Sequence, residues 1–236
     1  MGYSIDEIET FCKEKYKKFL KVKKRTILKT LLNFSLFKET KVEGLIDGVI
    51  VEKNIDEKAL KKNVNRISDI CDKKLAIATV DTKSMKECIF TSDITNLKED
   101  NINYIDDINV GKAVRASMSF PAIFTTTNYK DYNFIDGGTI DNLPAKVLKD
   151  MGAEKIIAVS FDLSKYEPTN SMENVLVRAL DIFSSKDVRR GQECADITVE
   201  IYNPDTSLVK MNEFKKTINN GYNAVMEKKE ELLLLK

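Results

Sequence analysis

Residues 132–144 read Tyr132-Asn133-Phe134-Ile135-Asp136-Gly137-Gly138-Thr139-Ile140-Asp141-Asn142-Leu143-Pro144. The run that opens this stretch is rich in aromatic and β-branched side chains, which predicts a strand. The Asp-Gly-Gly turn comes next, and Pro144 favours the first turn of a following helix because an N–H is not needed there. The stretch therefore predicts a strand that ends in a carboxylate, followed by a tight turn and a helix.

The rest of the chain repeats this alternation. Short apolar or alternating runs predict further strands at residues 75–80, 87–91, 155–161 and 195–201. Helical spacing predicts helices over 110–119, 146–151, 172–190 and 214–235. In the last helix we expect four side chains to face inward, those of Phe214, Ile218, Tyr222 and Val225. The alternation predicts a single α/β domain over residues 1–236, with a largely parallel sheet covered by helices on both faces.

Composition narrows the classes of function. The 236 residues include 38 basic and 37 acidic side chains, so the charge balance gives no reason to expect a nucleic-acid partner. The four cysteines are far apart in the sequence, which is typical of reduced residues in a cytoplasmic protein. We expect neither a disulfide framework nor a metal site from them.

The sequence contains no histidine. This absence removes Ser-His-Asp and Cys-His catalysis and every metal site that depends on His. Hydrolytic chemistry in this chain would therefore use a carboxylate directly as its base. We expect no cofactor and no metal.

The N-terminal region bears on localisation. Ser4 and Glu7 have the spacing of a capping box, which predicts a helix almost at once. Acidic residues stand where a signal peptide would be basic and then apolar, so we expect a cytoplasmic protein. Lysines and an arginine crowd residues 13–25. They could form a basic amphipathic helix in peripheral contact with an anionic membrane, or the solvated face of a helix packed on the sheet, which we favour.

Several motifs follow one another along the chain. They are Ala116-Ser117-x-Ser119-x-Pro121-x-x-Phe124, Asp136-Gly137-Gly138, Asn142-x-Pro144 and Gly152-Ala153-Glu154-Lys155-Ile156-Ile157-Ala158-Val159. In this order the chain resembles the C-terminal portion of the patatin-like phospholipases, serine acyl hydrolases that cut fatty acyl esters from lipids. The resemblance extends from Met1 to about Glu227. It implies a patatin-like α/β/α fold, with a family core at about 1–165 and a C-terminal strand and helices at 166–236, and a lipid or other acyl ester as substrate.

The resemblance also implies roles for individual residues. Asp136 would be the catalytic partner of a serine nucleophile and would accept the proton of its hydroxyl group. Gly137 and Gly138 would support the turn, because glycine adopts backbone geometries that other residues resist. Asn142 and Pro144 would have a structural role at the exit into the next helix.

The serine half of this dyad is missing from the sequence. The family's Gly-x-Ser-x-Gly elbow and glycine-rich oxyanion loop are absent from the 236 residues. The segment Gly2-Tyr3-Ser4-Ile5-Asp6 lacks the second glycine, and capping explains Ser117 and Ser119 better. We favour the C-terminal part of a longer, active enzyme that lacks its N-terminal strands. The alternative is a non-catalytic remnant that binds lipid or a partner. In either case we expect this chain alone to be inactive.

Overall fold

The computed structural model describes residues 4–10, 49–60, 63–121, 124–162, 172–203 and 214–235. The basic run at 13–25, and the membrane contact predicted for it, lie outside these residues. The predicted first helix is confirmed where it is described, because residues 5–10 are helical and the capping box is formed. The Glu7 N–H donates to Ser4 Oγ at 3.2 Å, and the Ser4 N–H donates to Glu7 Oε2 at 2.8 Å.

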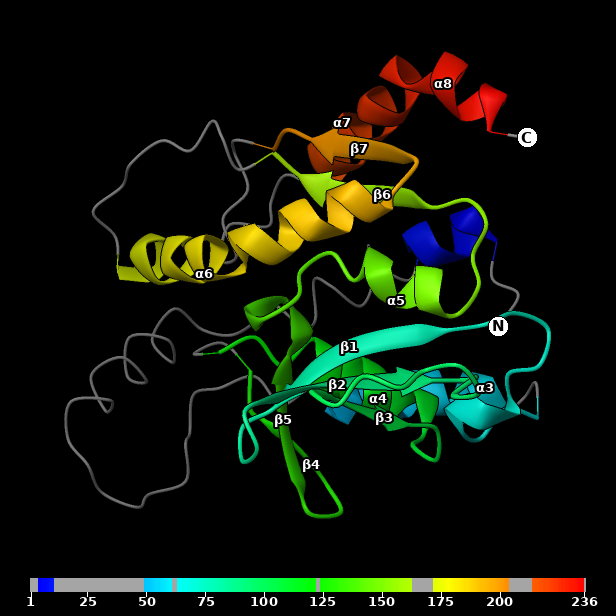
Figure 1. Cartoon of the computed structure of the whole chain (residues 1–236), viewed down its shortest axis with the longest axis vertical. Helices are drawn as coiled ribbons and strands as arrows, with labels where there is room; N and C mark the ends of the chain where they lie inside the picture. Colours follow the sequence, from blue (N-terminus) through cyan, green and yellow to red (C-terminus); the bar gives the residue numbers. More distant parts are fainter. Residues whose placement is uncertain are drawn as a thin grey trace.

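Most of the described strands belong to one five-stranded sheet, in the order β3-β2-β1-β5-β4 (Figure 1). Its strands are β1 (Ala76–Asp81), β2 (Lys86–Thr91), β3 (Ile102–Ile105), β4 (Thr127–Tyr129) and β5 (Tyr132–Asp136). β1 is antiparallel to both β2 and β5, and β4 is antiparallel to β5, whereas β2 and β3 are parallel. A second sheet consists of two parallel strands, β6 (Ile157–Phe161) and β7 (Ile197–Ile201).

The α/β class is confirmed, and the sheet is mixed where we expected it to be largely parallel. The connections explain the difference. Residues 82–85 join β1 to β2 and residues 130–131 join β4 to β5, and both links are too short for the crossover that a parallel pair requires. Met85 and Lys130 adopt positive φ angles of 55° and 50° in these turns. Such turns reverse the chain directly, so each of these neighbouring pairs is antiparallel.

Helices lie on both faces of the five-stranded sheet, as the alternation predicted. The described helices are α3 (Val49–Leu60), α4 (Val110–Ser117), α5 (Ala145–Asp150), α6 (Met172–Cys194), α7 (Phe214–Glu227) and α8 (Lys229–Leu234), with 3-10 turns η1 (Ile67–Asp69) and η2 (Gly137–Thr139). α4 covers one face and contacts α3, whereas α5 covers the other face and lies between the two sheets (Figure 1). Just after α5, Gly152 has a φ of 90°, a conformation that favours glycine at a helix end.

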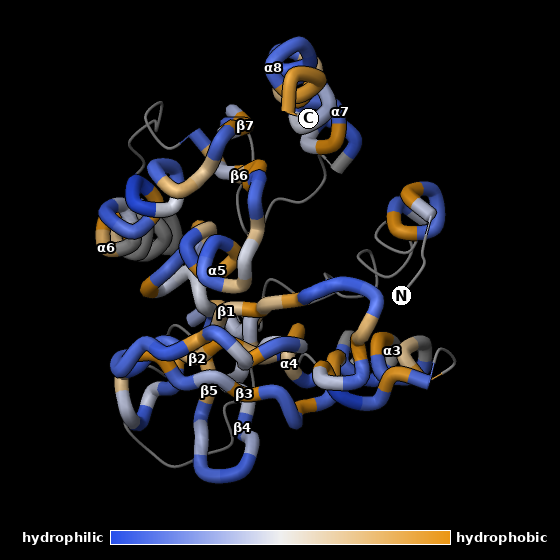
Figure 2. Tube along the Cα trace, turned by 45° about the vertical axis from the view of Figure 1, so that its right-hand side comes forward, coloured by the Kyte–Doolittle hydropathy of each residue, from blue (hydrophilic) through white to orange (hydrophobic). Residues whose placement is uncertain are grey.

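Two apolar cores hold the sheet between these helices. On the α4 face the buried residues are Ile67, Cys88, Phe90, Ile105, Ile108, Val110, Ala113, Ala116 and Phe134. On the α5 face they are Ile89, Leu97, Val147 and Met151. Hydrophobic stretches of β1, β2 and α4 are visible in orange in Figure 2. Consecutive residues of β2, Ile89 and Phe90, enter opposite cores, as expected for a strand covered on both sides.

The C-terminal helix differs from the prediction in continuity and in orientation. It is divided into α7 and α8 at Lys228. Ile218, Tyr222 and Val225 are 39%, 64% and 43% exposed, so the prediction that they face inward is wrong. The Phe214 side chain lies outside the described part of the structure.

Small residues of α7 face β7 instead. Ala224 is buried with Ile197 and Val199, and a Cβ at Gly221 would lie 3.7 Å from Ile201 Cδ1. A helix approaches a sheet most closely through its smallest side chains, and this face of α7 offers them. The stripe of larger apolar residues, Ile218, Tyr222 and Val225, is therefore exposed. None of the described helices is both long and apolar enough to cross a membrane.

Candidate active site at Asp136

Asp136 is held at the end of β5 by two neighbouring parts of the fold. Its N–H donates to the carbonyl oxygen of Ser119, just after α4, at 3.1 Å. It also lies opposite Thr79 of β1, whose Oγ1 donates to the carbonyl oxygen of Ile135 at 2.7 Å. Two of the motifs recognised in the sequence, around Ser119 and at Asp136, therefore meet in space.

The Asp136 carboxylate is fixed through one oxygen. Oδ1 accepts the Gly138 N–H at 2.8 Å, and Thr139 Oγ1 donates to the Asp136 carbonyl oxygen at 2.8 Å. Among the described residues, no other group donates to the carboxylate and no cation pairs with it. The second oxygen, Oδ2, accepts no hydrogen bond from a described residue. It is therefore available to accept a proton or a hydrogen bond from a group that arrives from outside.

The surroundings of Asp136 raise the pKa of its carboxyl group. Burial raises the pKa of this carboxyl group, and the hydrogen bond from Gly138 offsets only part of the increase. A general base is most effective when its pKa lies near the working pH. A partly buried carboxylate with one unoccupied oxygen is therefore suited to remove a proton from an alcohol.

Asp81, a carboxylate at the C-terminal end of β1, has the opposite character. Its oxygens accept hydrogen bonds from the N–H groups of Lys83, Ser84 and Asn133, at 3.3, 2.9 and 2.9 Å, and from Ser84 Oγ at 2.7 Å. Burial would raise the pKa of Asp81, but these hydrogen bonds outweigh it and lower the pKa. The residue stabilises the β1–β2 turn, and its acceptors are occupied.

Gly137 lets the motif pass close to β1. A Cβ built on Gly137 would lie 2.5 Å from the Ala78 carbonyl oxygen and 2.9 Å from the Ala78 Cβ, both rigid parts of the strand. We predict that Gly137→Ala lowers the free energy of unfolding by about 1–3 kcal/mol, because the overlap forces β1 and the turn apart. Urea denaturation measures the change.

Gly221→Ala is the matched control. A Cβ at Gly221 makes only an ordinary contact with the flexible end of Ile201, and alanine favours the helical conformation of α7. We expect this variant to be as stable as the natural chain or slightly more so. Equal losses in both variants would contradict the proposed role of the Gly137–Ala78 contact.

The other residues predicted to support the motif surround the same turn. Pro144 stands at the N-terminal cap of α5 with a φ of −75°. Asn142 is exposed, and its Oδ1 would be 2.8 Å from a Cβ at Gly138. The same Cβ would lie 3.2 Å from Asp136 Oδ1, so glycine at 138 keeps the carboxylate uncrowded. This geometry supports a structural role for Asn142 and Pro144.

Two of the serines considered as nucleophiles, Ser119 and Ser4, form hydrogen bonds with other groups. Ser119 Oγ donates to the Arg115 carbonyl oxygen at 2.8 Å and shares a hydrogen bond with Thr127 Oγ1 at 3.1 Å. This confirms the predicted capping role of Ser119 at the end of α4. Ser4 Oγ accepts the Glu7 N–H in the capping box. Within the part of the chain that the structure describes, no hydroxyl group donates to the Asp136 carboxylate.

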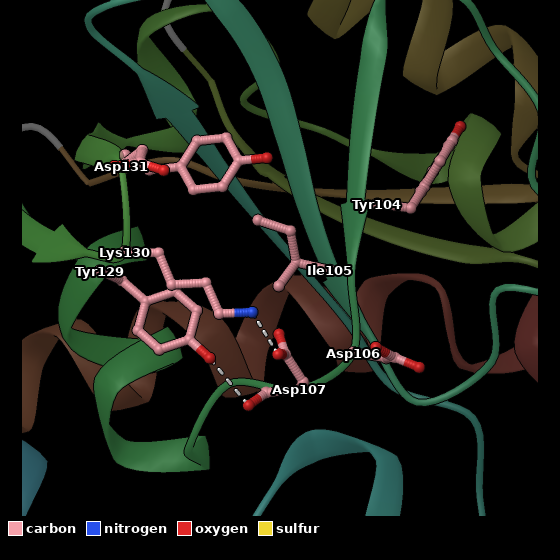
Figure 3. A pocket seen from close by; sticks show the side chains of 8 residues that line it. Tyr104, Ile105, Asp106, Asp107, Tyr129, Lys130 and Asp131 are labelled. Atoms are coloured by element: carbon pink, nitrogen blue, oxygen red, sulfur yellow. Dashed lines mark hydrogen bonds and ion pairs between the residues drawn. The ribbon is translucent and has the colours of Figure 1, made fainter.

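An open surface groove of about 440 Å³ lies at the other end of β5. Its lining residues are Tyr104, Ile105, Asp106, Asp107, Tyr129, Lys130, Asp131 and Tyr132 (Figure 3). Tyr129 Oη donates to the Asp107 carbonyl oxygen at 2.9 Å, and Lys130 forms an ion pair with the Asp107 carboxylate. Four residues of strand, roughly 13 Å, separate Tyr132 from Asp136, so the groove is not part of the Asp136 site.

Comparison with known protein families agrees with the motifs. The family model described as Patatin-like phospholipase matches residues 1–149, more than half of the 236 residues. The matched region contains the segment around Ser119, the Asp-Gly-Gly turn and Pro144. The chain belongs to the patatin-like phospholipase family of lipid hydrolases.

Proposed function

We propose that this chain supplies the acidic half of a Ser-Asp dyad that hydrolyses acyl esters of lipids. The observation that supports it best is the state of the Asp136 carboxylate. One oxygen is held by the Gly138 N–H, and no described residue occupies the other. A base in this position can align a serine hydroxyl group and take its proton.

The steps of the reaction define what Asp136 contributes. As the serine oxygen attacks the ester carbonyl, its proton passes to Asp136 Oδ2, and the carboxyl group gives this proton to the leaving alcohol as the carbon–oxygen bond of the ester breaks and the acyl–serine remains. Water then attacks the acyl group, the same carboxylate accepts its proton, and that proton returns to the serine oxygen as the fatty acid leaves. None of the 236 residues is a histidine, so no imidazole of this chain can take this role.

We propose that the chain does not catalyse this reaction by itself. Without one member of a triad, a hydrolase retains roughly 10³–10⁴-fold catalysis from its oxyanion hole and substrate binding. The sequence lacks both the Gly-x-Ser-x-Gly elbow and the glycine-rich loop that would form the oxyanion hole. In our proposal, residues 1–236 form one patatin-like domain that N-terminal strands carrying both motifs would complete.

A reconstitution experiment tests this function. The 236-residue chain and the same chain preceded by the Gly-x-Ser-x-Gly segment of an active family member are each assayed with p-nitrophenyl butyrate. We expect turnover from the joined protein and none above buffer from the chain alone. A folded joined protein, verified by circular dichroism, that remains inactive would contradict the proposal.

A non-catalytic module that binds lipid or a partner is the second candidate. The observation that favours it is the apolar face of β6, where Ile157, Val159 and Phe161 are 52%, 55% and 57% exposed. Among the described strands, β6 pairs only with β7, and no other described strand covers its outer edge. An edge strand with this pattern is prone to associate with another apolar surface.

This candidate predicts that Val159→Asp weakens binding to vesicles of anionic phospholipid about 10-fold or more, since burial of a valine contributes roughly 1.5–3 kcal/mol. Thermal stability should hardly change because the side chain is exposed. Co-sedimentation with vesicles measures binding, and Asn96→Asp, at an exposed position, controls for the added charge. Equal binding by the natural chain and Val159→Asp would remove β6 from consideration.

A further inference from the structure

Glu87 of β2 is a half-buried acid with one shielded oxygen that has no hydrogen-bond partner among the described residues. It lies on the same face of the strand as Ile89, the face covered by α5. The shielded oxygen is Oε1. An ionised oxygen that is shielded from solvent and has no partner is strongly unfavourable, so this environment favours the protonated form of Glu87.

The charges that face Glu87 are mainly negative. The groups that act on it from neighbouring elements are Asp141 after η2, Asp187 on α6, Glu99 before β3, and the single cation Arg190 on α6. Some of these groups are already in ion pairs. Arg190 contacts Asp187 at 3.3 Å, and Lys146 of α5 pairs with both Glu99 and Asp150. Tyr104 on β3 and Cys88 on β2 are further titratable neighbours. No described cation is left to neutralise Glu87.

Asp141 lies in the link from η2 to α5, which packs tightly against α6, the helix that carries Asp187. A Cβ at Gly191 of α6 would overlap the Leu143 carbonyl oxygen. The Leu143 N–H donates to Asp141 Oδ1 at 3.0 Å, and the Asp141 N–H donates to the Gly137 carbonyl oxygen at 3.0 Å. The acidic cluster is therefore joined, through a few hydrogen bonds, to the turn that follows Asp136.

We propose that Glu87 is a proton-dependent latch that fastens α6 onto the Asp136 turn. When Glu87 is protonated, the carboxyl group is neutral and α6 packs closely. When it is ionised, repulsion from Asp141 and Asp187 loosens the contact. The proposal depends on this packing and not on catalysis by Asp136, so it stands or fails independently of the proposed function.

The direction of the pH dependence follows from the environment. Burial, and then the charges of Asp141, Asp187 and Glu99, raise the pKa of Glu87 from 4.5 to about 7. The folded chain therefore binds more protons than the unfolded chain between these values. The stabilisation is fully present below pH 4.5 and is lost as the pH rises through about 7. A difference of this size corresponds to an effect on the order of 100-fold on an opening or unfolding equilibrium.

Hydrogen exchange and urea denaturation of the 236-residue chain at pH 5 and pH 8 test the latch. After correction for the intrinsic exchange rate, we expect the opening constants of α6 and of residues 137–143 to increase on the order of 100-fold more in the natural chain than in Glu87→Gln. Glu87→Gln should also be the more stable protein at pH 8. Glu154→Gln is the matched control and should keep the natural pH dependence, because this exposed carboxylate is not among the charges that act on Glu87.

Two results would overturn the latch. One is the same pH dependence in the natural chain and in Glu87→Gln. The other comes from the natural chain alone and does not depend on the folding of a variant. In a carbon-13 NMR titration we expect the Glu87 carboxyl group to titrate near pH 7, whereas titration near pH 4.5 would show that the interface does not hold the proton.

Discussion

Asp136→Asn in the joined, active protein is expected to lower kcat for an acyl ester about 10²–10⁴-fold, the usual contribution of a general base. The amide can still accept the Gly138 N–H, so the turn should keep its shape, but it cannot accept the proton of the serine. The KM should change little, because the loss falls on a step that follows binding. Steady-state kinetics with p-nitrophenyl butyrate measure both constants.

The control for this variant is Asp131→Asn, which removes an exposed carboxylate in the β4–β5 turn. We expect it to retain the activity of the joined protein. The rate of the joined protein should also decline toward acid pH, because Asp136 acts only when ionised and burial raises its pKa. Unchanged turnover in Asp136→Asn would remove Asp136 from the mechanism.

Phe134→Ala is expected to lower the free energy of unfolding by about 3–5 kcal/mol, the usual range for a buried phenylalanine. The Phe134 ring is fully buried, meets Phe90 edge to face at 5.0 Å and stacks on Tyr132 at 5.3 Å between centroids. It is also two residues from Asp136, so the cavity would disturb the strand that carries the carboxylate. Urea denaturation measures the loss.

Phe161→Ala provides the comparison, since it removes the same side chain from a position that is 57% exposed. We expect a loss below about 1 kcal/mol there, because little apolar surface leaves a buried environment. Similar losses in the two variants would show that the α4-face core does not depend on Phe134.

The positions of several strands and helices could be predicted from short sequence patterns. β1, β2, β5, α4 and α5 lie within a few residues of their predicted positions. The directions of the strands were harder to predict, because an apolar run looks alike in parallel and antiparallel pairs. The orientation of α7 was missed for a related reason. Periodicity identified the stripe at Ile218 and Tyr222, but contact with β7 uses the smaller residues Gly221 and Ala224.

In the candidate site, too, the contiguous motif could be predicted from the sequence, whereas contacts between distant segments could not. The Asp-Gly-Gly motif located Asp136 and the close turn at Gly137, because both depend on a short, contiguous pattern. The support from the Ser119 carbonyl oxygen could not be foreseen, since it is a backbone contact between segments distant in sequence. Thr139 carried a weak signal, a hydroxyl residue just after a turn. The isolation of Glu87 depends on four charges from three separate segments, and no local pattern records it.

Labelling with a fluorophosphonate tests the central claim most directly, because the reagent forms a covalent adduct only with an activated serine. The 236-residue chain, its Asp136→Asn variant and the joined protein are treated in parallel and analysed by intact-mass spectrometry. We predict one adduct on the serine of the Gly-x-Ser-x-Gly segment in the joined protein and none on the 236-residue chain. A stoichiometric adduct on Ser4, Ser117 or Ser119 of the natural chain, lost in Asp136→Asn, would show that the chain already contains its nucleophile.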